Sequence, residues 1–321
     1  MRFLGLFVCA ASLAAQYAVA APDCTLKKVA SFDVSVDSGS LLTSAQIEGK
    51  DLKVMLDTGS PFNLVDQELA DELKLSRQSM MGYQVTDAAG KLTAHMASAH
   101  SVSIGDWKAT NVPFLVSGEN RSAHSNVQAV FGNPFLEAND LELDLAHGKV
   151  NLFLRDHCPG QVVYWTHEYV QIPIRLQQSG HIALPVTLDG RQTFAMLDTG
   201  ASRSLVSKRM AETDFNIMPG GDSDKPDGFM VAGTGAHLPF YKHVFGKFDI
   251  GGIEFHNTQL LISPDRLDLI TKSENNNPHI AIQDDKPVET PIILGLPHIT
   301  KLRLFFAFGE HMVYVTPADA H

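Results

Sequence analysis

The sequence predicts an all-β protein built from two similar units, and three observations lead to this fold class. A motif occurs twice: residues 54–60 read Val-Met-Leu-Asp-Thr-Gly-Ser, and residues 195–201 read Ala-Met-Leu-Asp-Thr-Gly-Ala. The sequence after the first motif aligns without a gap with the sequence after the second, residues 85–116 against 231–262. Finally, 24 Gly and 16 Pro are spread over the 321 residues, which favours many turns and short strands. An internal repeat of this kind determines the fold that a sequence predicts.

The first twenty residues predict a secretory signal peptide. Arg2 is their only charge, residues 4–15 form a short apolar region, and Ala18-Val19-Ala20 has the small residues of a cleavage site. The apolar region is too short to span a bilayer as a helix. We therefore expect cleavage before Ala21, no membrane anchor, and export to a bacterial periplasm, with an extracellular or lysosomal location as the alternative.

Each unit begins with the same order of elements. Gly49 and Gly190 stand eight residues before the Asp of their motif, and each predicts a β-hairpin. After each motif, a short Leu-Val strand leads into a brief helix. The helices begin after Asp66 in the first unit and after Ser207 in the second, and both are good N-cap residues.

The second part of each unit also repeats. A Gly-bearing hairpin is followed by an Ile-Gly pair, by two apolar residues with a Gly, and by a last amphipathic strand. In the first unit these are residues 85–92, Ile104-Gly105, Gly132 and 141–145. Their counterparts in the second unit are residues 231–238, Ile250-Gly251, Gly295 and 302–306.

The repeat therefore divides the chain into two units, about residues 39–154 and 176–316. Residues 21–38 lead into the first unit, and residues 155–175 link the two. The second unit carries a polar, turn-rich insertion through residues 273–287, which is typical of a mobile surface loop.

Composition excludes several function classes. The net charge of −11 argues against a nucleic-acid partner. The 14 His do not follow the spacing of metal ligands, so we expect no metal and no cofactor. Cleavage of the signal peptide leaves Cys24 and Cys158, and an even pair in an oxidising compartment predicts a disulfide. Two free buried thiols are the alternative.

The repeated aspartates suggest one reaction. Two carboxylates held side by side cannot both ionise cheaply, so one of them keeps a proton. The ionised group can take a proton from a bound water, while the protonated group polarises a peptide carbonyl. A lone Asp-Thr-Gly is more often an ordinary turn, and we interpret Asp37-Ser38-Gly39-Ser40 in that way. The paired motifs in their repeat context favour catalysis by Asp57 and Asp198.

The order apolar-apolar-Asp-Thr-Gly-Ser/Ala, Gly hairpin and apolar-apolar-Gly resembles the retropepsin-like and pepsin-like aspartic proteases. The resemblance covers both units, which is nearly all of the mature chain. It implies an all-β fold of two similar, pseudo-twofold-related acid-protease lobes with an active-site cleft between them. Because one chain carries both motifs, it also implies a monomer with units of retropepsin size.

The resemblance also implies roles for particular residues. Asp57 and Asp198 would be catalytic, Thr58 and Thr199 would hydrogen-bond across the pseudo-twofold axis, and two glycines would pack behind them. The supporting set is Thr58, Gly59, Ser60, Thr199, Gly200, Ala201, Gly132 and Gly295. The flap candidates, which would clamp an extended peptide, are Asp87, Ala88, Ala89 and Gly90 in the first unit and Gly233, Thr234, Gly235 and Ala236 in the second.

We therefore expect an exported aspartic endopeptidase that cleaves extended protein or peptide segments. The alternative is a non-catalytic peptide-binding protein on the same scaffold; degradative and narrowly processing peptidases are not distinguished. The two motifs differ after their Gly, where Ser60 stands against Ala201. Because a hydroxyl can donate to a neighbouring carboxylate and favour its charged form, we hypothesise that Asp57 is the ionised partner and Asp198 the protonated one.

Overall fold

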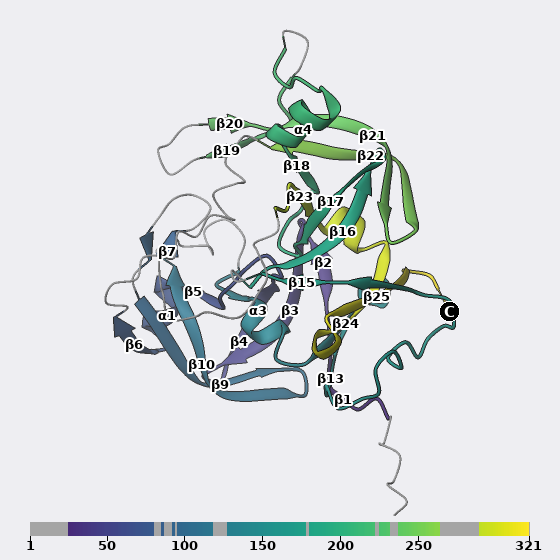
Figure 1. Ribbon diagram of the computed structural model, residues 1–321. Helices are drawn as coiled ribbons and strands as arrows, with labels where there is room; N and C mark the ends of the chain where they lie inside the picture. Colours follow the sequence, from purple (N-terminus) through teal and green to yellow (C-terminus); the bar gives the residue numbers. More distant parts are fainter. Residues whose placement is uncertain are drawn as a thin grey trace, which may run out of the picture.

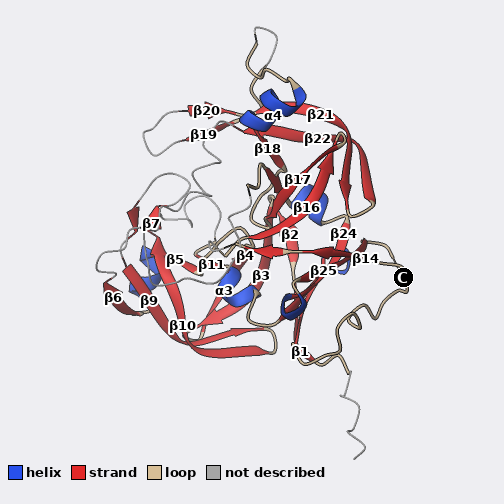
Figure 2. Cartoon of the chain, in the orientation of Figure 1, coloured by secondary structure: helices blue, strands red, loops and turns tan. Residues whose placement is uncertain are grey.

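A computed structural model of the chain describes residues 25–79, 85–86, 92–93, 95–117, 127–177, 180–221, 225–231, 237–263 and 289–320. These residues form mostly strands with a few short helices, arranged as two similar lobes (Figures 1 and 2). The predicted all-β, two-lobed fold is confirmed. The signal peptide, Cys24, the eight flap candidates and the insertion through residues 273–287 lie outside the described residues.

The first lobe is an eight-stranded sheet that closes on itself, because β3 and β9 also pair. Short helices α1 (Gln67–Glu72) and α3 (Asn133–Leu136) accompany it, and a small hairpin joins β7 (Val85–Thr86) to β8 (Leu92–Thr93). In sheet order, the strands are β2 (Ser35–Asp37), β3 (Ser40–Ile47), β4 (Lys50–Leu56), β11 (Ala129–Phe131), β5 (Leu64–Asp66), β10 (Trp107–Ser117), β9 (His95–Ile104) and β6 (Ser76–Ser79).

The second lobe repeats this arrangement with a seven-stranded sheet that closes through the additional β16–β21 pairing. Helices α4 (Lys208–Phe215) and α6 (Leu296–Ile299) correspond to α1 and α3, and the small hairpin joins β19 (Phe229–Val231) to β20 (His237–Pro239). In sheet order, the strands are β15 (Arg175–Leu176), β16 (Ile182–Leu188), β17 (Arg191–Leu197), β23 (Ile292–Leu294), β18 (Leu205–Ser207), β22 (Ile253–Ser263) and β21 (Tyr241–Ile250).

Local backbone conformations follow the repeat closely. Gly49 and Gly190 both turn their hairpins with a left-handed φ, +80° and +81°. Asp66 caps α1 by accepting from the Leu69 N–H at 2.7 Å, and Ser207 caps α4 by accepting from the Met210 N–H at 3.2 Å. The predicted hairpins and helix starts are therefore confirmed.

A six-stranded sheet joins the two lobes. Strand β12 of the first lobe pairs antiparallel with β24 of the second, so hydrogen bonds run directly from lobe to lobe. The remaining strands flank this pair, and 3-10 turns Leu145–His147 and Phe308–Glu310 follow β12 and β24. In sheet order, the strands are β1 (Lys28–Asp33), β13 (Lys149–Phe153), β12 (Asp140–Asp144), β24 (Leu302–Ala307), β25 (Met312–Pro317) and β14 (Val170–Pro173).

Strands β12 and β24 correct one expectation. They were predicted to be amphipathic, yet both are buried along their whole length. Charged side chains of these strands pair with each other. Glu142 accepts two hydrogen bonds from Arg303 through one carboxylate oxygen, at 2.9 and 2.7 Å. The Arg303 guanidinium in turn lies 4.1 Å from the ring centre of Trp165, which belongs to the segment linking the lobes. Pairing with each other beneath the Trp165 ring lets these two charged side chains stay inside the joining sheet.

In the described part of the chain, no helix has the length and apolar character needed to cross a membrane. The predicted Cys24–Cys158 disulfide involves one residue outside that part and remains a prediction.

Candidate active site

The two Asp-Thr-Gly motifs meet where the lobes meet. Each follows the end of a strand, β4 or β17, that pairs in parallel with the strand preceding a buried glycine, β11 or β23. The two threonines are fully buried and bond across the interface: the Thr58 N–H donates to Thr199 Oγ1 at 3.0 Å, and the Thr199 N–H donates to Thr58 Oγ1 at 2.9 Å. Their hydroxyls then donate to the carbonyls of Leu197 and Leu56 at 3.0 and 2.8 Å. These four bonds fix the two loops relative to one another.

Each glycine of the motif touches both aspartates. The Gly59 N–H donates to Asp57 Oδ1 at 2.8 Å, and the Gly200 N–H donates to Asp198 Oδ1 at 2.8 Å. A Cβ placed on Gly59 would lie 2.5 Å from Cγ of Asp198, and one on Gly200 would lie 2.5 Å from Cγ of Asp57. A side chain at either glycine therefore has no room, and the two carboxyl groups are held close together.

Burial and the closeness of the two carboxyl groups raise the pKa of Asp198. Burial, followed by the negative charge of Asp57 and a hydrogen bond between the two side chains, raises the pKa of Asp198 well above its usual value. The backbone N–H groups of Gly200 and Ala201 oppose this rise. Two carboxyl groups this close favour a state with one proton between them. The assignment of that proton to Asp198 stays a prediction.

The reason that the sequence offered for an ionised Asp57 was wrong. Ser60 was expected to donate its hydroxyl to Asp57, but the Ser60 hydroxyl donates to the carbonyl of Phe62 at 2.7 Å. A serine carries one hydroxyl proton, so this bond uses the donor that the hypothesis assigned to Asp57. Ala201 occupies the corresponding position in the second loop and has no hydroxyl.

Gly132 and Gly295 lie directly behind the two loops, as the resemblance implied. A Cβ on Gly132 would lie 2.4 Å from the carbonyl oxygens of Ser60 and Phe62, and one on Gly295 would lie 2.4 Å from that of Arg203. Close backbone approach requires glycine at both positions. Their N–H groups donate to the loops as well, Gly132 to Asn63 Oδ1 at 3.1 Å and Gly295 to Ser204 Oγ at 2.9 Å.

Two residues beside the first loop were missed from the sequence. Asn133, at the start of α3, donates its side-chain amide to the carbonyl of Thr58 at 3.0 Å and to that of Gly180. The ring of His181, directly before β16, places Nε2 3.0 Å from the carbonyl oxygen of Gly59. The repeat could have marked both positions, because a polar residue stands in one unit where the other has a different residue type. Leu296 is equivalent to Asn133, and Ser40 is equivalent to His181.

The flap candidates can be followed only to their stems. Val85 pairs with Thr93 and Thr86 with Leu92 in the first lobe, and Val231 pairs with His237 in the second. The sequence placed hairpins at residues 85–92 and 231–238, and the described strands agree with that placement. The eight residues proposed for the flap tips lie between these strands and outside the described residues.

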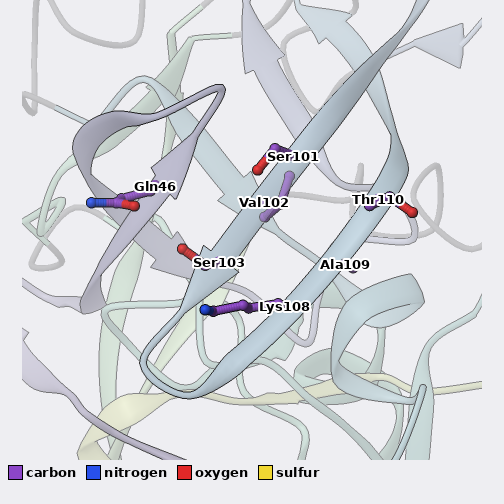
Figure 3. Close-up of a pocket in the computed structure, with 7 residues that line it drawn as sticks. All are labelled: Gln46, Ser101, Val102, Ser103, Lys108, Ala109 and Thr110. Carbon is purple, nitrogen blue, oxygen red and sulfur yellow. The ribbon is translucent and has the colours of Figure 1, made fainter.

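A groove on the first lobe is separate from this site. Its lining comes from β3, β9 and β10 and includes no residue of either Asp-Thr-Gly motif (Figure 3). The residues that line it are Gln46, Ser101, Val102, Ser103, Lys108, Ala109 and Thr110.

Each lobe matches a model of an aspartyl protease family. Residues 43–135 match the family model described as aspartyl protease, and residues 184–271 match that of the gag-polyprotein aspartyl protease. Together the two matches cover more than half of the chain, and each contains one Asp-Thr-Gly motif. No curated protein sequence matches the chain. Among solved structures, the chain is similar to basic 7S globulin from soybean, with 10% identity and a TM-score of 0.48 over 92% of this chain and 98% of that one.

Proposed function

The chain belongs to the aspartic protease-like family, and from this premise we propose that it is an endopeptidase that cleaves extended protein or peptide segments with the carboxyl pair Asp57 and Asp198. The observation that carries the proposal is the pair of buried loops, locked by crossed threonines, which hold two carboxyl groups close enough that burial and the charge of Asp57 raise the pKa of Asp198. A binding protein has no need of two carboxyl groups held at such electrostatic cost.

The proposed reaction begins with a water between the two carboxyl groups. The ionised Asp57 takes a proton from this water while the water oxygen attacks the carbonyl carbon of the substrate peptide. The protonated Asp198 donates a hydrogen bond, and then its proton, to the carbonyl oxygen. The intermediate then collapses and the C–N bond breaks. Asp57 gives its proton to the leaving nitrogen, which departs as the amine, and Asp198 takes back a proton from a hydroxyl of the intermediate.

The remaining features of the proposal concern the substrate and its setting. The paired stems at β7–β8 and β19–β20 support strand-like clamping of an extended peptide. We propose export through a cleaved signal peptide, most simply to the periplasm, as a monomer without cofactor or nucleic-acid partner. A Cys24–Cys158 disulfide would then tie the lead-in to the linker beside the joining sheet.

The proposal is tested with the mature chain, from Ala21, and a random peptide library. We expect cleavage that pepstatin inhibits. Asp57→Asn and Asp198→Asn should each lower kcat by about 10³-fold or more, because one carboxyl group cannot act as acid and base at once. The double variant should lose little more, because the two groups act as a unit.

Asp37→Asn is the matched control, because Asp37 belongs to the exposed turn that resembles the motif. It should keep wild-type activity. If the wild-type chain binds peptides without cleaving them, the proposal is contradicted and the non-catalytic alternative is favoured. Substantial cleavage by either Asn variant would also contradict the proposal.

A further inference from the structure

His181 lies on the opposite lobe from the loop that it touches. It directly precedes β16 of the second lobe, yet its Nε2 is 3.0 Å from the carbonyl oxygen of Gly59 in the first catalytic loop. The residue is 2% exposed. A carbonyl oxygen only accepts hydrogen bonds, so Nε2 must carry the proton and donate it.

This bond acts on the peptide groups that support Asp57. The Gly59 N–H donates to Asp57 Oδ1 at 2.8 Å, while the carbonyl of the same residue accepts from His181. Gly59 is thus held at both ends. Asn133 adds to this grip, since its amide joins the carbonyl of Thr58 to that of Gly180, the residue before His181.

The first lobe shows that the fold does not require this histidine. Gly39 and Gly180 stand at equivalent positions before β3 and β16, and both have a left-handed φ, +79° and +80°. Ser40 follows Gly39 where His181 follows Gly180. Among the described residues, the Ser40 side chain makes no hydrogen bond to the second loop, yet the Gly200 N–H reaches Asp198 Oδ1 at the same 2.8 Å.

We propose that His181 is a positioning residue, which holds the Asp57 loop from the opposite lobe and so fixes Asp57 for its role as the base. This inference rests on the proposed function. Burial lowers the pKa of His181, against the opposing influence of the Gly59 carbonyl and the charge of Asp57. The neutral ring still carries the Nε2 proton, so the bond does not depend on the ring being charged.

The test compares three variants of the mature chain. His181→Ser, which introduces the residue of the first lobe, should lower kcat by about 10- to 100-fold, as expected for a misplaced catalytic group, with KM changed by less than about threefold. His181→Gln keeps an N–H donor on a side chain of similar length and should restore kcat to within about threefold of wild type. Ser40→Ala is the matched control at the equivalent position and should behave as wild type.

Three kinetic results would overturn the inference. One is a kcat of wild-type size in His181→Ser, and another is an equal loss in His181→Ser and His181→Gln, which would show that the donor is not what matters. The third is a rise in KM alone, which would assign His181 to substrate binding instead.

A measurement without activity separates this inference from the proposed function. The ¹⁵N resonances of the His181 ring in the wild-type chain report which nitrogen carries the proton, and we expect the Nε2–H form. The Nδ1–H form would overturn the inference even if the enzyme cleaves peptides. If His181→Ser does not fold, the tautomer of the wild-type ring still tests the inference. A wild-type chain that cleaves nothing would instead refute the proposed function, whatever the tautomer.

Discussion

The loop that carries Asp57 and the loop that carries Asp198 share their backbone bonds but differ in their surroundings. Both have the crossed threonine bonds and a glycine N–H on the aspartate. Around the first loop, polar side chains donate to the backbone: Asn133 to Thr58 and His181 to Gly59. Around the second loop, the equivalent positions hold Leu296 and Ser40.

A second contrast lies deeper in each lobe. Phe135 of the first lobe packs against aromatic rings, with Phe131 and Trp107 as neighbours. His298, at the equivalent buried position, also lies against two aromatic rings, but in addition it hydrogen-bonds Ser204 and Thr258 at 2.7 and 2.9 Å. Ser204 also receives the N–H of Gly295 behind the second loop. The comparison teaches that a repeated scaffold can place two identical carboxyl groups in different surroundings, because the residues around them need not repeat.

The feature that the two loops share most strictly should be the easiest to break. Gly59→Ala and Gly200→Ala each place a Cβ about 2.5 Å from the opposite aspartate. We expect either change to displace the pair and to lower kcat by about 100-fold or more. Peptide cleavage assays with both variants measure this loss. Gly309→Ala is the matched control, since its Cβ would meet nothing within 4 Å; a similar loss there, or none at the two loop glycines, would contradict the geometry.

His298→Phe gives the second lobe the residue type of the first, and it should reduce the loss of folding stability at acid pH. Burial, with a smaller contribution from Lys301, lowers the pKa of His298 to about 4 from its ordinary 6.5. As the pH falls from 6.5 to 4, the unfolded chain takes up a proton that the folded chain refuses, so the free energy of unfolding decreases. This loss amounts to at most about 3 kcal/mol.

The variant with Phe should lack that pH-dependent loss. Guanidinium unfolding of wild type and His298→Phe between pH 4 and 7 measures the difference in slope. His256→Phe serves as the control, because the His256 side chain is exposed, and it should keep the wild-type slope. Parallel pH profiles for wild type and His298→Phe would show that His298 does not take part in acid destabilisation.

Asn133→Leu gives the first loop the residue of the second. It leaves the carbonyls of Thr58 and Gly180 without the side-chain amide. We expect the free energy of unfolding to fall by about 2 kcal/mol, the typical cost of leaving buried acceptors unpaired. Chemical denaturation measures this change. Leu296→Met, a volume-conserving change at the equivalent site, should cost less, and an equal cost in the two variants would mean that Asn133 does not hold the loop.

The exchange of Ser60 and Ala201 should have the smallest effect on catalysis. Because the Ser60 hydroxyl donates to Phe62, Ser60→Ala should leave the acid limb of the kcat/KM profile within about 0.3 pH unit, a small fraction of the roughly one unit that a lost carboxylate hydrogen bond would produce. Ala201→Ser should likewise leave the alkaline limb in place. An upward shift of about one unit in the acid limb of Ser60→Ala would show that the hydroxyl serves Asp57 after all.

The sequence by itself determined the architecture and the pairing of the two Asp-Thr-Gly motifs. The repeat predicted two similar lobes, and left-handed Asn111 and Asn257, with φ of +56° and +49°, show how faithfully the backbone follows it. Helix starts at Asp66 and Ser207 were also predictable. These features are local, since a turn, a cap or a short motif specifies its own conformation from neighbouring residues.

The tertiary structure alone decided what surrounds the two aspartates. Nothing local to His181 indicates that its ring meets Gly59, 122 positions away in the chain. The same holds for Glu142 and Arg303, whose strands look amphipathic until the linker covers them. Ser60 shows that even a residue of the motif can have a partner that the sequence does not reveal, because its hydroxyl donates to the Phe62 carbonyl in the folded loop. Such contacts depend on distances between segments that only the packed chain brings together, and polar side chains bond to whichever partner burial leaves within reach.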